Sequence, residues 1–163
     1  MKKRNEVDPK EIWAIEDLYA TDEAFYADIK KLAGMADEFK KNFQDLKTAD
    51  DVYKSLEAYA EISGLTDRLG TFSGISKETD ATDDAMAKRD AKFGSEYAKI
   101  AATLSFYDSA LVKVDPQILD TVAKDHPGYE YYLKRVKEEA KYLLDEKTEA
   151  VSYTHLTLPT TPY

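Results

Sequence analysis

Apolar side chains recur at steps of three and four residues over two long stretches of the chain. In the first stretch they are Phe25, Ile29, Leu32, Ala36, Phe39, Phe43 and Leu46. In the second stretch they are Val52, Leu56, Tyr59, Ile62, Leu65, Leu69 and Phe72. Because these steps match the period of an α-helix, each stretch predicts an amphipathic helix that buries one apolar stripe.

A third stretch has a stricter repeat. Met86, Phe93, Ile100 and Tyr107 lie seven residues apart, and the positions between them hold Tyr97, Leu104 and Leu111. This repeat predicts one helix of about thirty residues that packs against a neighbour as in a coiled coil. The repeat does not identify the neighbour. Two other long amphipathic helices are available, so we favour a partner within the same chain.

Residues that favour helix N-termini precede each stretch. They are Thr21 and Asp22; Thr48, Asp50 and Asp51; and Thr79, Asp80 and Thr82, with Asp83 and Asp84 close behind. Further along, Asp115-Pro116 predicts a short helix, His126-Pro127-Gly128 ends it, and residues 129–140 predict a last amphipathic helix. Leu144-Asp145-Glu146 resembles one more helix start, with Asp145 as its cap.

The sequence therefore predicts an all-α fold, an antiparallel bundle of long amphipathic helices with short connecting helices. Its 6 glycines and 5 prolines leave few turn formers for a many-stranded sheet. Residues 1–20 are expected to be an extended lead-in, clamped to the body by Trp13, Ile15, Leu18 and Tyr19, with Trp13 as the packing anchor. Residues 21–150 are expected to be one helical domain. Gly64, Gly70 and Gly74 are interpreted as sites of close helix contact or a kink.

The last thirteen residues, VSYTHLTLPTTPY, differ from the rest of the chain. They contain no charged residue and no helical period, whereas charged residues make up 34% of the whole sequence. The string resembles the translation of a transposase-end sequencing adapter. We therefore expect residues 151–163 to be non-native and the gene to continue; the alternative is a natural disordered tail.

Charge and composition exclude several classes of function. The net charge of −9 repels nucleic acid and anionic membranes. With no cysteine, the chain has no disulfide, thiolate chemistry or cysteine-bound zinc. The N-terminus lacks the apolar run of a secretory signal, and no stretch approaches the ~20 apolar residues that span a bilayer. We expect a cytoplasmic protein.

No residue in the sequence stands in a recognisable catalytic or ligand-binding pattern. The two histidines, His126 and His155, do not form an H-E-x-x-H pair. Asp50-Asp51 and Asp83-Asp84 are explained by the helix dipole, and no G-x-S-x-G or phosphate-binding glycine motif is present. Tyr129 and Tyr132 share one helical face, which favours core packing. The sequence predicts no catalytic residue, no cofactor-binding residue and no metal ligand in this chain.

The order of several features resembles the start of the oligoendopeptidase F family, zinc metallopeptidases related to thimet oligopeptidase. These features are W-x-I-x-D-L-Y-x-x-D-E-A-F at residues 13–25, the helix through Arg89, Phe93 and Tyr97, then Asp115-Pro116, and Tyr142-Leu143-Leu144-Asp145-Glu146. The resemblance covers about residues 8–150. It implies a mostly helical protein in which an N-terminal helical part covers a deep cleft. A later part would carry H-E-x-x-H and a third zinc ligand, a glutamate, and cleave short peptides, commonly in the cytoplasm.

None of those zinc or catalytic positions falls within this chain. The leading hypothesis is therefore the N-terminal helical region of a truncated zinc oligoendopeptidase, with no zinc of its own. Its partners would be the missing catalytic part of the same chain and, in the parent enzyme, short peptide substrates. Apolar faces that normally rest on that part would leave the chain marginally soluble or associating. The alternative is a stand-alone helical interaction module that pairs through residues 86–111. Negative charge opposes a third hypothesis, a nucleic-acid or cofactor-binding domain.

Overall fold

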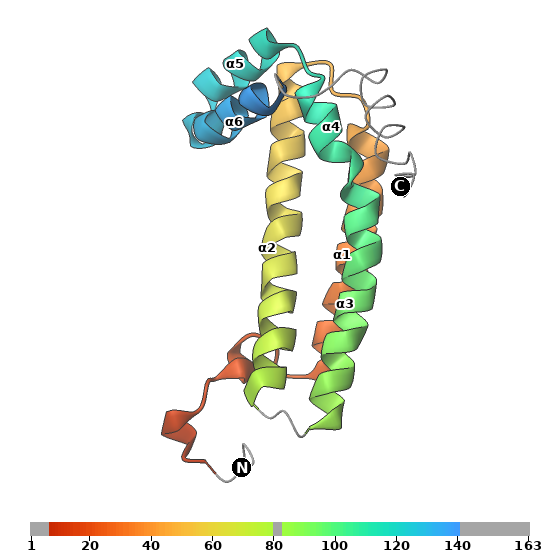
Figure 1. The fold of residues 1–163 in the computed structure, drawn as a ribbon, viewed down its shortest axis with the longest axis vertical. Coiled ribbons are helices and arrows are strands. Elements are labelled where there is room, and N and C mark those ends of the chain that lie inside the picture. The colour runs from red at the N-terminus through yellow and green to blue at the C-terminus, as the bar shows by residue number, and fades with distance from the viewer. Residues whose placement is uncertain (1–6, 80–82, 141–163) are drawn as a thin grey trace, which may run out of the picture.

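The computed structural model describes residues 7–79 and 83–140, and every regular element in these ranges is helical. Three long helices, α1 (Asp22–Phe43), α2 (Ala49–Thr79) and α3 (Asp84–Leu104), run side by side in alternating directions (Figure 1). Each of the three contacts the other two. The predicted all-α antiparallel bundle is confirmed. The helix start at Leu144-Asp145-Glu146, His155 and the string at 151–163 lie outside the described residues.

Helix α1 begins where the sequence predicts. The hydroxyl oxygen of Thr21 accepts a hydrogen bond from the Ala24 amide at 3.3 Å, and Asp22 and Glu23 place negative charge at the positive end of the helix. The buried residues of α1 follow the predicted stripe; they are Phe25, Ile29, Leu32, Ala36 and Phe39.

Helix α2 begins with a reciprocal cap. The Thr48 hydroxyl accepts from the Asp51 amide at 3.1 Å, and the Asp51 carboxylate accepts from the Thr48 amide at 2.9 Å. Of the predicted apolar stripe, α2 buries Val52, Leu56, Ile62, Leu69 and Phe72, while Tyr59 and Leu65 are half-buried. It also buries three serines that the pattern did not predict to be buried, Ser55, Ser73 and Ser76. Each serine hydroxyl donates to a backbone carbonyl within its own helix, so burial leaves no hydroxyl unpaired.

Side chains of the seven-residue repeat pack into the core of the same chain, but they do not lie on one continuous helix. Phe93, Ile100, Tyr107 and Leu111 are buried, as the repeat predicts. The predicted helix of about thirty residues is wrong: α3 ends at Leu104 and α4 (Phe106–Val112) follows after Ser105. The Ser105 hydroxyl donates to the Ala102 carbonyl at 2.9 Å. Helix α4 packs on α6.

Two further details of this region differ from the prediction. Thr79 is not a start signal but the last residue of α2. Asp83 is the cap of α3, and its carboxylate accepts from the amides of Ala85 at 2.8 Å and Met86 at 3.3 Å. Tyr97, placed on the seam by the repeat, is 45% exposed.

Two short helices cover one end of the bundle. Asp115 caps α5 (Pro116–Asp125) through the Gln117 amide at 2.8 Å, as predicted. A single 3₁₀ turn, η4 (Pro127–Tyr129), then leads into α6 (Glu130–Ala140). Helix α5 packs against α2 and α6, and both short helices lie beside the N-terminal end of α2 (Figure 1).

The lead-in is held by Ile15 and Tyr19 rather than by Trp13. Its two 3₁₀ turns are η2 (Pro9–Glu11) and η3 (Ile15–Asp17). Ile15 and Tyr19 are buried, whereas Trp13 is 68% exposed, so the prediction of Trp13 as packing anchor is wrong. A guanidinium nitrogen of Arg68 donates to the Leu18 carbonyl at 2.6 Å, and the same group lies 4.7 Å from the centre of the Tyr19 ring.

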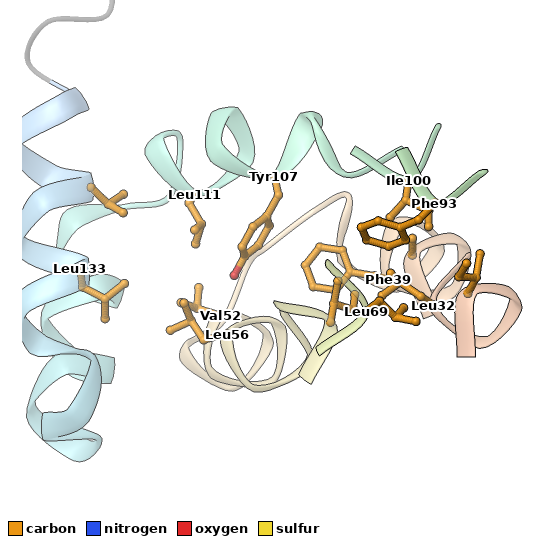
Figure 2. Packing of buried hydrophobic residues seen from close by; sticks show 14 of the residues in the cluster. Leu32, Phe39, Val52, Leu56, Leu69, Phe93, Ile100, Tyr107, Leu111 and Leu133 are labelled. Atoms are coloured by element: carbon orange, nitrogen blue, oxygen red, sulfur yellow. The ribbon is translucent and has the colours of Figure 1, made fainter. Parts of the chain in front are cut away.

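Buried residues from all three long helices meet in one core, part of which Figure 2 shows from close by. Phe93 and Ile100 of α3 lie close to Leu32 and Phe39 of α1 in the close-up, while Leu111 and Leu133 extend the cluster toward α6. A β-carbon at Gly70 would lie 3.5 Å from the Phe93 ring, an ordinary contact distance. At Gly64 and Gly74 a β-carbon would meet nothing within 4 Å, so close helix contact accounts for none of the three glycines. No helix in the described ranges has the length and apolar content needed to cross a membrane.

Candidate functional site

A surface groove lies between α2 on one side and α3 with the start of α4 on the other. We call it the α2–α3 groove. Its volume is about 280 Å³, and its lining includes Tyr59 and Asp67 from α2, Tyr97, Ile100 and Leu104 from α3, and Asp108 from α4. Ile100 is buried and Leu104 half-buried, so the groove has an apolar floor.

Two tyrosine rings form the aromatic part of this groove, and each is supported from the core. Tyr59 stacks on the buried Tyr107 with ring centres 4.9 Å apart, and Tyr97 stacks on the buried Phe93 at 5.9 Å. Because buried rings fix their orientation, Tyr59 and Tyr97 present ordered aromatic surfaces. Tyr97 is the more accessible of the two.

The charge of the groove is negative and uncompensated. Among residues 7–79 and 83–140, neither Asp67 nor Asp108 takes part in an ion pair. No lysine, arginine or histidine of these ranges lines the groove. Since both carboxylates are exposed on a chain of net charge −9, the groove favours cations over anions.

The Tyr59 hydroxyl at the groove stays protonated at neutral pH. Burial raises the pKa of Tyr59, with smaller contributions from Asp108 and Tyr97. Burial also raises the pKa of Tyr132 on α6 to about 12, with Asp108 and Tyr59 adding to the effect. Tyr132 therefore lies near the same carboxylate, and it is 37% exposed rather than packed in the core as predicted.

The His126 side chain packs against α2. Its ring stacks on Tyr53 of α2, with ring centres 3.5 Å apart and the planes 5° from parallel. Beside it, the Tyr129 hydroxyl donates to Glu57 at 2.5 Å, which is the largest cause of a Tyr129 pKa of about 12. These contacts hold the turn before α6 against α2. The sequence did not predict the stack.

Metal-ligand candidates are scattered over the described part of the chain. Within residues 7–79 and 83–140, no three histidine, aspartate or glutamate side chains are placed so that they could hold one ion. Asp51 and Asp83 cap helices, and Asp50 pairs with Lys54 at 2.6 Å. These three carboxylates, considered in the sequence analysis, therefore cap helix N-termini or form an ion pair at the surface.

Sequence reasoning placed Tyr59 and Tyr97 in the core and gave no role to Asp67 or Asp108. One signal was available. The residues Tyr97, Ala101, Leu104 and Asp108 follow one another at four-, three- and four-residue steps, which places them on one helical face. That face shares Tyr97 and Leu104 with the seam and adds Ala101 and the carboxylate of Asp108. Pairing it with the face of α2 required the tertiary structure.

No protein-family model matches the chain, and no solved structure matches it. Three curated proteins are similar to it. An oligoendopeptidase F homolog of Borreliella burgdorferi is 26% identical over 96% of this chain and 27% of its own length. Oligopeptidase PepF of Bacillus subtilis is 21% identical over 91% of this chain and 23% of its own. The group B oligopeptidase PepB of Streptococcus agalactiae is 20% identical over 90% of this chain and 25% of its own.

The chain thus spans about a quarter of the length of the curated relatives it matches. The similarity extends over nearly all of the chain and recurs in relatives from several organisms. It supports a common origin with oligoendopeptidases of the F type.

Proposed function

We propose that this chain is the N-terminal helical region of a zinc oligoendopeptidase that hydrolyses short peptides in the cytoplasm. One observation carries the proposal: the similarity to proteins named oligoendopeptidase F and PepF spans more than nine-tenths of the chain but only about a quarter of each relative. In this proposal residues 1–20 are the lead-in, residues 21–150 the helical domain, and residues 151–163 an adapter-derived string.

The bundle suits the role of a wall. Three long helices share a core that runs along their length, and the stack of His126 on Tyr53 holds the turn between the two short helices against α2. A rigid wall of this kind would narrow the entrance to a cleft, so that only short, flexible peptides reach the reaction centre. Helix α2, at 31 residues, is the longest element of that wall.

The described residues do not fit a zinc ion. They contain one histidine, and its ring is stacked on Tyr53; carboxylates do not converge with it. A peptidase zinc site needs three protein ligands around one ion. The proposal therefore assigns the metal and the hydrolytic chemistry to the remainder of the parent polypeptide, which is also the expected partner of this chain.

The proposal is tested on the purified 163-residue chain. It is incubated with zinc and a set of fluorogenic short peptides, with and without a chelator, and dialysed for metal analysis. We expect no hydrolysis and no zinc retained in stoichiometric amount. Chelator-sensitive cleavage by the chain would contradict the proposal. A second test reads the source DNA beyond codon 150, where we expect an open frame that reaches an H-E-x-x-H sequence.

The alternative of a stand-alone interaction module receives no support from the fold. That hypothesis relies on the apolar seam at residues 86–111 as a pairing surface. In the structure Phe93, Ile100, Tyr107 and Leu111 are buried against the chain's own helices. Pairing with a second protein through these four buried residues would require the bundle to open.

A further inference from the structure

We propose that the α2–α3 groove is a binding site for an arginine side chain presented by a peptide segment. The groove combines two supported tyrosine rings, an apolar floor and two carboxylates without an ion-pair partner in the described ranges. This inference goes beyond the wall proposed above and does not depend on it.

The geometry fits a guanidinium group better than other ligands. A planar cation can lie over a tyrosine ring while its N–H groups point to a carboxylate. The methylene groups of the same side chain can rest on the apolar floor formed by Ile100 and Leu104. An anionic ligand is opposed by Asp67 and Asp108, and a purely apolar one would leave both carboxylates desolvated without a partner.

The chain itself contains this arrangement once in full, at Arg89, and once in part, at Arg68, whose N–H donates to a backbone carbonyl instead of a carboxylate. The Arg89 guanidinium lies 5.0 Å from the centre of the Phe72 ring, and one of its nitrogens is 2.6 Å from an Asp22 oxygen. The Arg68 guanidinium lies 4.7 Å from the centre of the Tyr19 ring. In both places an aromatic ring of the bundle receives an arginine. The α2–α3 groove offers ring and carboxylate but has no arginine of the described residues in it.

Binding is tested on the full chain by nuclear magnetic resonance, with the tripeptide acetyl-Leu-Arg-Leu-amide as probe. Its isostere with citrulline in place of arginine has the same shape and no charge. We expect saturable shifts at the amides of Ser63 and Ala101, which line the groove. The citrulline peptide should bind about twofold to fivefold more weakly, the factor expected for one partly exposed cation–π or ionic contact.

Variants at three groove positions, Asp67, Tyr97 and Asp108, assign the contacts. Asp67→Asn and Asp108→Asn should each lower the affinity for the arginine peptide by about twofold to fivefold. Neither should change the affinity for the citrulline peptide. Tyr97→Ala should lower the affinity for the arginine peptide, whereas Tyr97→Phe, which keeps the ring, should not. Asp37→Asn, an exposed carboxylate of α1 away from the groove, is the matched control. Because all four positions are exposed, circular dichroism should show an unchanged fold in each variant.

Several results would overturn the proposal. One is equal affinity for the arginine and citrulline peptides; another is a groove variant that behaves like the Asp37→Asn control. Shifts confined to other surfaces, or shifts that follow protein concentration rather than peptide concentration, would show that the groove binds something else or pairs with a second copy. None of these readouts involves hydrolysis, so they are independent of the test of the peptidase origin.

Discussion

The hydroxyl of Ser55 on α2 lies 2.8 Å from the hydroxyl of Tyr107 on α4, and both side chains are buried. The Ser55 hydroxyl also donates to the Val52 carbonyl at 2.7 Å. Since the single serine proton is used there, the Tyr107 hydroxyl donates to the serine oxygen. This hydrogen bond links α2 to α4, the helix that begins after Ser105.

Ser55→Ala should lower the free energy of unfolding by about 1–3 kcal/mol, because it leaves the buried Tyr107 hydroxyl without an acceptor. Tyr107→Phe should lower the free energy of unfolding by a smaller amount, about 0.5–1.5 kcal/mol, because the Ser55 hydroxyl keeps its hydrogen bond to the Val52 carbonyl. Denaturant unfolding measures both. In the double variant the free energy of unfolding should fall by less than the sum of the two single losses. If the losses added strictly, the two hydroxyls would not be coupled.

Leu111→Ala should be among the costly core substitutions, at about 2–5 kcal/mol of unfolding free energy. Leu111 is fully buried where α4 meets the rest of the core, so truncation leaves a cavity that rigid neighbours cannot fill. Leu65→Ala on α2 is the matched control, since Leu65 is only half-buried. Equal losses at the two positions would contradict the placement of α4 in the core.

Gly64→Ala should stabilise the chain by up to about 1 kcal/mol, because alanine has the higher helix propensity and a β-carbon at Gly64 meets nothing within 4 Å. Thermal unfolding followed by circular dichroism checks the shift. At Gly70 the added carbon would touch the Phe93 ring at 3.5 Å, an ordinary contact distance. A destabilised Gly64→Ala variant would mean that another surface packs there.

Stability should fall at alkaline pH. Burial, and to a smaller extent the hydrogen bond to Asp28, raises the pKa of Tyr19 from its ordinary value of 10.0 to about 12. The folded state therefore holds the phenol proton more tightly than the unfolded chain does. This contribution is complete below pH 10 and is lost as the pH rises from 10 through about 12.

The measurement is the free energy of unfolding at several values across that interval. Tyr19→Phe should show a shallower decline than the parent chain, because the group that ionises has been removed. Tyr131→Phe is the control, since the Tyr131 side chain is 74% exposed. Parallel pH curves for the Tyr19→Phe variant and the parent chain would show that Tyr19 ionises equally easily in the folded and unfolded states.

Some of the fold could be predicted without coordinates because it depends on neighbours along the chain. The stripe from Phe25 to Phe39 and the caps Thr21 and Asp115 follow from the helical period and from the short reach of capping side chains. The same local reasoning failed at Ser105, where α3 ends and α4 begins within an apparently continuous repeat. It failed again at Trp13, because the size of a side chain does not say which surface it meets.

What the sequence alone determined is the set of helices, their apolar faces and the absence of a recognised catalytic motif. The tertiary structure decided which faces meet. It turned Tyr97 toward solvent, stacked His126 on Tyr53, and brought Asp67 of α2 and Asp108 of α4 to the same groove. The physical reason is that periodicity reports the direction of a side chain about its own helix axis. The relative rotation and crossing of helices far apart in sequence depend on how their side chains interlock.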